Sequence, residues 1–144
     1  MTTLHRTALV PYQPKQMFAL VNQIEHYPEF LPWCHGTTVT SRTESEVIAT
    51  IEVAAKGIHK QFTTRNVLQP DSRMEMHLVE GPFREFLATW QFEPIGDAGC
   101  KVMLDMSFEF SNKIMSMLLG TVFNRAVNSM IEAFTKRAAE VYGS

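Results

Sequence analysis

NKIMSMLLGTVFNRAVNSMIEAFTKRAAEVY, residues 112–142, is the stretch that decides the fold. It predicts one helix of about 30 residues, which is roughly 45 Å long. Asn112 is a suitable N-cap, Gly143 stands where a left-handed residue closes a helix, and no proline interrupts the span. One face of this helix carries an apolar stripe, typical of a helix that packs on a sheet. The stripe consists of Met115, Leu119, Val122, Phe123, Ala126, Met130, Ala133, Phe134 and Val141.

The first two turns of this helix depart from the stripe. Ile114, Met117 and Leu118 fall on the face that is polar further along, so this end is apolar almost all round. Either a loop covers these side chains, or they gate a cavity or contact a partner. Gly120 fits both interpretations, because a glycine inside a helix costs about 1 kcal/mol relative to alanine and is tolerated where another group approaches closely.

The segment from Thr37 to Phe110 instead shows short alternating runs separated by turn residues such as Gln69-Pro70-Asp71-Ser72 and Glu80-Gly81-Pro82. Connections this short cannot be crossovers, so the strands are expected to form an antiparallel meander. Its apolar face, rich in Met and Phe, indicates core filling or, as the alternative, a cavity. The residues predicted to face inward are Val47, Ala49, Ile51, Val53, Ile58, Phe62, Leu68, Met74, Met76, Leu78, Phe86, Ala88, Trp90, Phe92, Val102, Leu104, Met106, Phe108 and Phe110.

Two short helices are expected before the meander. Thr3 to Val10 predicts a strand, and Pro14 opens an amphipathic helix with apolar residues at helical spacing. The stretch from Tyr27 to Cys34, YPEFLPWC, places Phe30, Leu31 and Trp33 on a unit with two prolines. This unit is either a structural staple that buries Phe30 and Leu31, or a rigid lip over a cavity.

These elements together predict an α+β fold over residues 1–144 as a single domain. In it a curved antiparallel sheet of about six to seven strands wraps around the long C-terminal helix, with two short helices after the first strand. The chain of 144 residues can bury a core without metals or disulfides.

Composition excludes several classes of protein. The formal net charge of −2 gives no global basic field for DNA or anionic lipid, so any RNA contact must be local. Cys34 and Cys100 do not resemble a disulfide framework, and the first ten residues do not resemble a secretion signal, so we expect a cytoplasmic protein with free thiols. No apolar run is long enough to span a membrane.

The sequence offers no clear catalytic or metal-binding set. Cys34 and His35 are adjacent but suit no triad, and the histidines lack metal-ligand spacing, so neither catalytic residues nor a metal is predicted. The inward-facing set lacks carboxylates for acid/base chemistry, which argues against an enzyme. A local basic group of Lys56, His59, Lys60 and Arg65 is either a solvated strand face or an RNA contact.

Several motifs carry a resemblance to a known family: RTALVPY at 6–12, YPEFLPWC at 27–34, FTTRN at 62–66, VEGPF at 79–83, and the FEFSNK that leads into the long helix. The chain resembles, nearly end to end, the coenzyme Q-binding, polyketide cyclase-like branch of the START superfamily. Gln13 departs from the serine that often caps the first helix in that family. The resemblance implies a helix-grip fold, in agreement with the pattern of the residues.

The resemblance also implies two functions. In mitochondrial relatives the domain binds ubiquinone between sheet and long helix and supports respiration; in bacterial toxin-like relatives it binds the large ribosomal subunit and blocks subunit association. We expect non-enzymatic binding of ubiquinone or a related isoprenoid as the main function, with no other cofactor, and ribosome binding as the alternative. Carried over by position, the ligand-binding residues are Phe30, Leu31, Trp33, Phe62, Met76, Leu78, Phe83, Trp90, Phe108, Leu119 and Phe123. The candidate contacts to ribosomal RNA are Lys56, Lys60 and Arg65.

Overall fold

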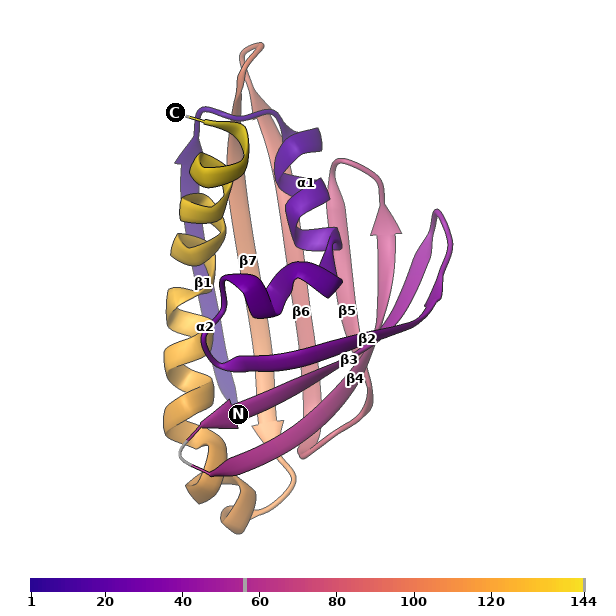
Figure 1. The fold of residues 1–144 in the computed structure, drawn as a ribbon, viewed down its shortest axis with the longest axis vertical. Coiled ribbons are helices and arrows are strands. Elements are labelled where there is room, and N and C mark those ends of the chain that lie inside the picture. Colours follow the sequence, from indigo (N-terminus) through magenta and orange to yellow (C-terminus); the bar gives the residue numbers. More distant parts are fainter. Residues whose placement is uncertain (56, 144) are drawn as a thin grey trace.

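The structure, a computed structural model, describes residues 1–55 and 57–143 (Figure 1). The predictions made for Lys56 and for the side chain of Ile58 lie outside the described residues. The elements in chain order are β1 (Thr2–Val10), α1 (Pro14–Asn22), the 3-10 helix η1 (Ile24–Glu29), β2 (Cys34–Arg42), β3 (Glu46–Ala55), β4 (Ile58–Gln69), β5 (Arg73–Glu80), β6 (Phe83–Ile95), β7 (Gly99–Phe110) and α2 (Lys113–Tyr142).

The seven strands form one antiparallel sheet in the order β1-β7-β6-β5-β4-β3-β2. Strands β2 to β7 pair as a meander, and β1 pairs with β7 at the far edge. Figure 1 shows the sheet curving around the side on which α1, η1 and α2 lie. The α+β helix-grip prediction is therefore confirmed. No helix in the described part of the chain is long and apolar enough to cross a membrane.

The ends of α2 are where the sequence places them. The side chain of Asn112 accepts a hydrogen bond from the backbone N–H of Met115 at 2.9 Å, which satisfies one of the free donors of the first turn. Gly143 closes the helix with a φ of 84°, and its N–H donates to the Ala139 carbonyl at 3.0 Å. Gly120 is not required by a close approach, because a Cβ there would meet nothing within 4 Å.

The buried stripe of α2 differs from the predicted one at its end. Leu119, Phe123, Ala126, Val127, Phe134 and Ala138 are buried. Val141, predicted in the stripe, is exposed. At the last turn of α2 the Tyr142 hydroxyl donates to the Gln16 carbonyl of α1 at 3.0 Å. Tyr142 therefore takes the place that the spacing gives to Val141.

The start of α1 is closed without the serine common in the family. Pro14 occupies the first helical turn, as the sequence predicts. The side chain of Gln16 reaches back and accepts a hydrogen bond from the backbone N–H of Gln13 at 2.8 Å. Glutamine three residues after the cap thus satisfies a terminal donor of the helix.

Candidate functional site

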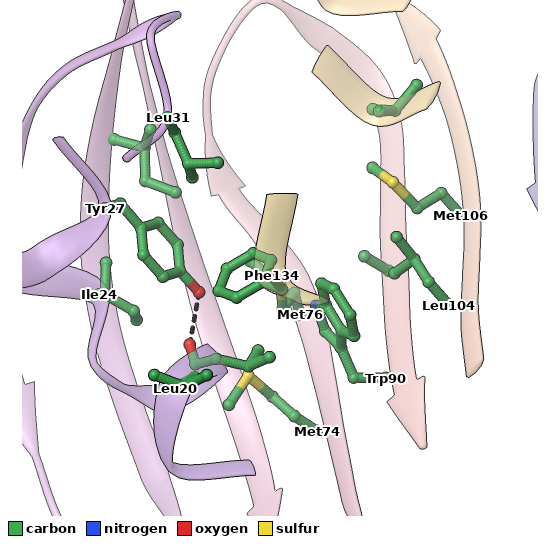
Figure 2. Close-up of a cluster of buried hydrophobic side chains, with 14 of the residues drawn as sticks. Leu20, Ile24, Tyr27, Leu31, Met74, Met76, Trp90, Leu104, Met106 and Phe134 are labelled. Atoms are coloured by element: carbon green, nitrogen blue, oxygen red, sulfur yellow. Dashed lines mark hydrogen bonds between the residues drawn. The ribbon is translucent and has the colours of Figure 1, made fainter. Parts of the chain in front are cut away.

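A small cavity lies between the inner face of the sheet and α2. Its volume is about 40 Å³. Since a water molecule needs at least about 10–15 Å³ in this measure, the cavity could hold a few waters at most. Figure 2 shows Tyr27, Met76, Trp90 and Phe134 converging on the same buried region. The lining residues are Tyr27, Trp33, Ile51, Phe62, Met76, Phe86, Ala88, Trp90, Leu104, Met106, Phe123, Ala126, Val127, Met130 and Phe134.

The sheet and the helix supply this lining by simple geometry. Met76 lies opposite Ala88, which lies opposite Met106, so three adjacent strands place one row of side chains under the cavity. The lining residues of α2 follow helical spacing from Phe123 to Phe134 and therefore share one face. One face of the sheet and one face of α2 therefore supply the cavity lining together.

Aromatic residues close the cavity at both ends. Below the first part of α2, Phe123 packs against a group of rings, with centroids 4.8 Å from Phe108 and 5.1 Å from Phe83. Below the second part, Phe134 packs edge-on against Trp90 at 5.3 Å and Tyr27 at 5.4 Å. The cavity is the space left between these two aromatic groups.

The one hydroxyl among the lining residues is already paired. The Tyr27 hydroxyl donates to the Val21 backbone carbonyl (dashed line in Figure 2), and burial raises the pKa of the phenol far above its usual range. No lining residue carries a carboxylate, an imidazole or a thiol. The site offers van der Waals contact to an apolar guest rather than acid/base groups.

Five of the eleven predicted ligand-binding residues line the cavity: Trp33, Phe62, Met76, Trp90 and Phe123. The remaining six, Phe30, Leu31, Leu78, Phe83, Phe108 and Leu119, do not line it.

Four of these six residues pack in the core beside the cavity instead. Phe83 and Phe108 belong to the aromatic group around Phe123, and Phe30 packs edge-on against Phe134 at 5.1 Å. Leu31 is 1% exposed, as the staple interpretation expects. The alternation of apolar and polar residues predicts which face of the sheet a side chain occupies. It does not predict how far along the strand the cavity extends.

Sequence reasoning missed ten lining residues as ligand contacts: Tyr27, Ile51, Phe86, Ala88, Leu104, Met106, Ala126, Val127, Met130 and Phe134. Most of them were predicted to face inward, so the signal was present. The helical spacing from Phe123 would have selected Ala126, Val127, Met130 and Phe134 together.

A buried polar pair on β4 was also missed. Thr64 and Asn66 have the same parity as the inward-facing Phe62, and both are almost completely buried. The Thr64 hydroxyl donates to Oδ1 of Asn66 at 2.8 Å, while Nδ2 of Asn66 has no partner among the described residues. Strand parity could have found this pair, which puts a polar group into an otherwise apolar interior.

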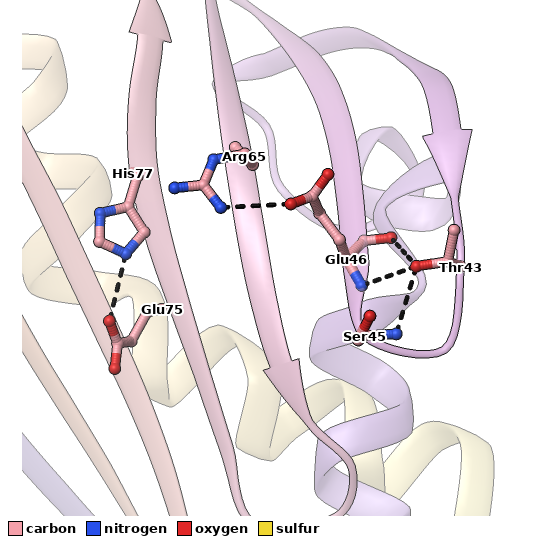
Figure 3. A network of polar contacts seen from close by, with 6 residues as sticks. All are labelled: Thr43, Ser45, Glu46, Arg65, Glu75 and His77. Atoms are coloured by element: carbon pink, nitrogen blue, oxygen red, sulfur yellow. Dashed lines mark hydrogen bonds and ion pairs between the residues drawn. The ribbon is translucent and has the colours of Figure 1, made fainter.

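The basic group predicted on β4 is partly neutralised. Nη1 of Arg65 lies 3.2 Å from Oε2 of Glu46, and Nδ1 of His59 lies 3.2 Å from Oε1 of Glu52. Figure 3 shows the pair of Arg65 and Glu46 across neighbouring strands. Lys60 is half-buried and makes no ion pair with a described residue. Lys60 has the parity of the inward-facing Phe62, so it lies on the opposite face of β4 from His59 and Arg65. The outer face of β4 therefore carries paired charges.

Both cysteines are free and buried. Burial raises the pKa of each thiol, Cys34 and Cys100, to about 11. At neutral pH both thiols are protonated, and the thiolate is the reactive form. Neither thiol is poised for nucleophilic chemistry.

Comparison with known proteins adds a family and several relatives. A family model described as polyketide cyclase / dehydrase and lipid transport matches residues 10–135. The ribosome association toxin RatA of Pseudomonas aeruginosa is 42% identical over 99% of both chains. The mitochondrial coenzyme Q-binding protein COQ10 homologue B of Xenopus laevis is 28% identical over 90% of this chain and 54% of its own length.

Solved structures agree with the fold. An 18 kDa protein from Caulobacter crescentus is 30% identical, matches over 100% of both chains, and superposes with a TM-score of 0.76. A START superfamily protein from Mycobacterium smegmatis superposes with a TM-score of 0.79 over 96% of this chain and 98% of its own, at 16% identity. The second likeness shows the START-like fold alone.

Proposed function

We propose that this chain, which belongs to the polyketide cyclase / dehydrase and lipid transport family, binds the large ribosomal subunit and blocks its association with the small one. Translation initiation would then be inhibited. The observation that carries this proposal is the full-length similarity to a relative whose name joins ribosome association with toxin. This order reverses the expectation from the sequence, in which ribosome binding was the alternative.

The surface that would contact ribosomal RNA is narrower than the predicted one. Arg65 is engaged by Glu46, so its charge is already partly compensated. Lys60 has no ion pair among the described residues and can donate to a phosphate at little cost in lost contacts. We therefore propose Lys60 as the described part of the RNA contact. Arg65 lies on the opposite face of β4 and does not belong to the same contact.

Sucrose-gradient sedimentation of ribosomes with the purified protein tests the proposal. We expect the protein to travel with the large subunit, and intact ribosomes to decrease as free subunits accumulate. A protein that stays at the top of the gradient with an unchanged ribosome profile would refute it.

A pair of charge reversals tests the contact itself. Lys60→Glu should weaken ribosome binding and make its salt dependence shallower by about one phosphate contact. Lys136→Glu, at an exposed position on the far part of α2, is the matched control and should leave the salt dependence unchanged. Equal effects of both variants would assign the change to net charge rather than to a contact.

We also propose a second function, the binding of a hydrophobic ligand such as ubiquinone between the sheet and α2, without a catalytic step. The apolar cavity supports it, as does the coenzyme Q-binding name of the Xenopus relative. Burying one five-carbon isoprene unit contributes on the order of 4 kcal/mol before association costs. The cavity of about 40 Å³ would have to enlarge, because ligand pockets usually measure about 300–1,000 Å³.

Retention of quinone by a substituted cavity tests this second function. Phe123→Arg places a charge in the cavity wall and should abolish retention of decylubiquinone by the delipidated protein. Asn124→Arg, exposed at the next position of the same helix, is the matched control and should retain it. If a folded Phe123→Arg variant still retains decylubiquinone, the cavity is not the quinone-binding site.

A further inference from the structure

A second hollow lies on the surface directly outside the cavity. It is a groove of about 590 Å³ between the loop after η1, the end of β3 and the first part of α2. Its lining residues are Pro32, Trp33, Ala54, Met117, Leu118, Thr121, Val122, Arg125, Ala126 and Ser129. Trp33 and Ala126 line both the groove and the cavity. These two side chains are therefore the partition between the two spaces.

The indole of Trp33 forms most of this partition, because the alanine side chain is only a methyl group. The backbone of Trp33 is fixed, since its carbonyl accepts a hydrogen bond from the Ala54 N–H at 3.0 Å. Its neighbours Leu31 and Cys34 are buried, which holds the loop on both sides. The Trp33 side chain itself is half-buried, and no hydrogen bond among the described residues involves its indole N–H. The indole packs against the core, but no described hydrogen bond fixes its orientation.

The chemistry of the groove suits an apolar chain whose head group is uncharged or anionic. Met117 is 83% exposed, and Leu118 is exposed beside it. The sequence contains no Asp or Glu between Glu109 and Glu132. Arg125 is the one charged residue in the groove lining, and no described carboxylate pairs with it. A cationic head group would meet repulsion here, whereas an oxygen-rich or anionic one would be accepted.

We propose that the groove and the cavity are two parts of one binding site for a single lipid, and that Trp33 is the partition that turns aside when its chain enters. The apolar chain passes Trp33 into the space beneath α2, and the head group stays in the groove near Arg125. This inference rests on the proposed binding of a hydrophobic ligand. It explains how a cavity of about 40 Å³ becomes large enough, because opening the partition joins it to the groove.

The two tryptophans of the chain provide separate reporters. Trp90→Phe leaves Trp33 at the partition, and Trp33→Phe leaves Trp90 in the cavity wall. Decylubiquinone, which carries an apolar chain, is titrated into each delipidated variant, with the chain-free ring ubiquinone-0 as the control. We expect decylubiquinone to quench Trp90 and, over the same concentration range, to raise the accessibility of Trp33 to acrylamide. Ubiquinone-0 should change Trp33 little.

A groove-filling substitution tests the path independently. Thr121 and Asn124 are both exposed on α2, but only Thr121 lines the groove. Thr121→Phe should weaken decylubiquinone binding at least about tenfold, and Asn124→Phe should change it less than about twofold. Both sites are on the surface, so both variants should fold.

The outcomes separate this inference from the proposed function. If decylubiquinone binds and quenches Trp90 while Trp33 and the Thr121→Phe variant are unaffected, ligand binding stands and the partition is wrong. If ubiquinone-0 acts on Trp33 as decylubiquinone does, the chain is not what opens the site, and the inference fails. If neither quinone binds the native protein, both the inference and the ligand-binding function fall.

Discussion

The two parts of α2 are held to the protein in different ways. The part from 126 to 142 is tied by side chains at several points: Asn128 accepts from Arg6 at 2.6 Å, Arg137 pairs with Glu29 at 2.7 Å, and Tyr142 donates to Gln16 at 3.0 Å. The part from 113 to 125 makes no side-chain hydrogen bond to another element among the described residues, and it is buried only through Leu119 and Phe123.

One continuous helix is therefore anchored by side-chain hydrogen bonds in one part and by the burial of two apolar side chains in the other. Segments that open locally have few buried contacts and few hydrogen bonds to their surroundings. The exposed Met117 and four further residues of the groove lining, Leu118, Thr121, Val122 and Arg125, belong to the weakly held part. Four predictions test this contrast, in order of decreasing effect.

The largest effect is expected from Phe134→Ala in the anchored part. Phe134 is 1% exposed and packs against three aromatic rings, so its removal should lower the free energy of unfolding by about 3–5 kcal/mol. Met117→Ala in the weakly held part is the matched control and should change it by less than about 0.5 kcal/mol. Urea denaturation measures both. A cost of several kcal/mol for Met117→Ala would show that this side chain is packed against the protein rather than exposed.

The two thiols report opening at the two ends of the molecule. Cys34 follows the loop at the groove, whereas Cys100 lies on β7 opposite Val10 at the other end. Both thiols have a pKa of about 11, so intrinsic reactivity does not separate them. Iodoacetamide should modify Cys34 at least about tenfold faster than Cys100, equivalent to about 1.4 kcal/mol less costly opening.

The pH dependence of this labelling has a definite sign. Below the raised pKa the thiolate fraction grows with pH, so both rates should rise about tenfold per pH unit between pH 7 and 9. Peptide mapping after timed quenching measures each cysteine separately. Equal rates for Cys34 and Cys100 would indicate that the whole molecule opens at once, and the contrast between the two ends would be lost.

A smaller effect is expected from Gly120→Ala in the weakly held part. A Cβ at this position meets no atom within 4 Å, so alanine adds helix propensity without a clash. The free energy of unfolding should rise by up to about 1 kcal/mol. Hydrogen exchange should slow for amides of the first part more than for those of the second. A loss of stability would mean that a neighbour approaches Gly120 after all.

The smallest effect concerns the exposed carboxylate that meets Arg137. Hydrogen bonds from His26 and then Arg137 hold the pKa of Glu29 below its usual range. A depressed pKa contributes stability above the unfolded pKa, and this contribution is lost as pH falls through the folded one. Arg137→Gln should raise the pKa of Glu29 measured by NMR, and its effect on stability should be the smallest of the four because solvent screens the exposed pair. An unchanged pKa would show that His26 alone sets it.

The fold could be predicted because its determinants are local. The cap at Asn112, the glycine at 143 and the alternation along the strands each depend on a few neighbouring residues. The site was harder to predict because it depends on distances between elements. Phe83 and Phe108 have the right parity but lie in a filled aromatic group, and Val127 lines the cavity although the stripe omits it. Predicting the groove requires knowing that the loop at Trp33 lies against α2, and the spacing of residues in the sequence does not reveal this.

The pairing of the first strand with the last has a consequence for the order of folding. Val10 pairs with Cys100, so β1 leaves the ribosome about 90 residues before its partner exists. At about 5–20 residues per second, β1 remains unpaired for several seconds or more while the hairpins from β2 to β6 can already form. The edge strand is then captured through contacts of high sequence separation, which are slow to form. The nascent chain therefore completes its sheet late, just before α2 is synthesised to cover it.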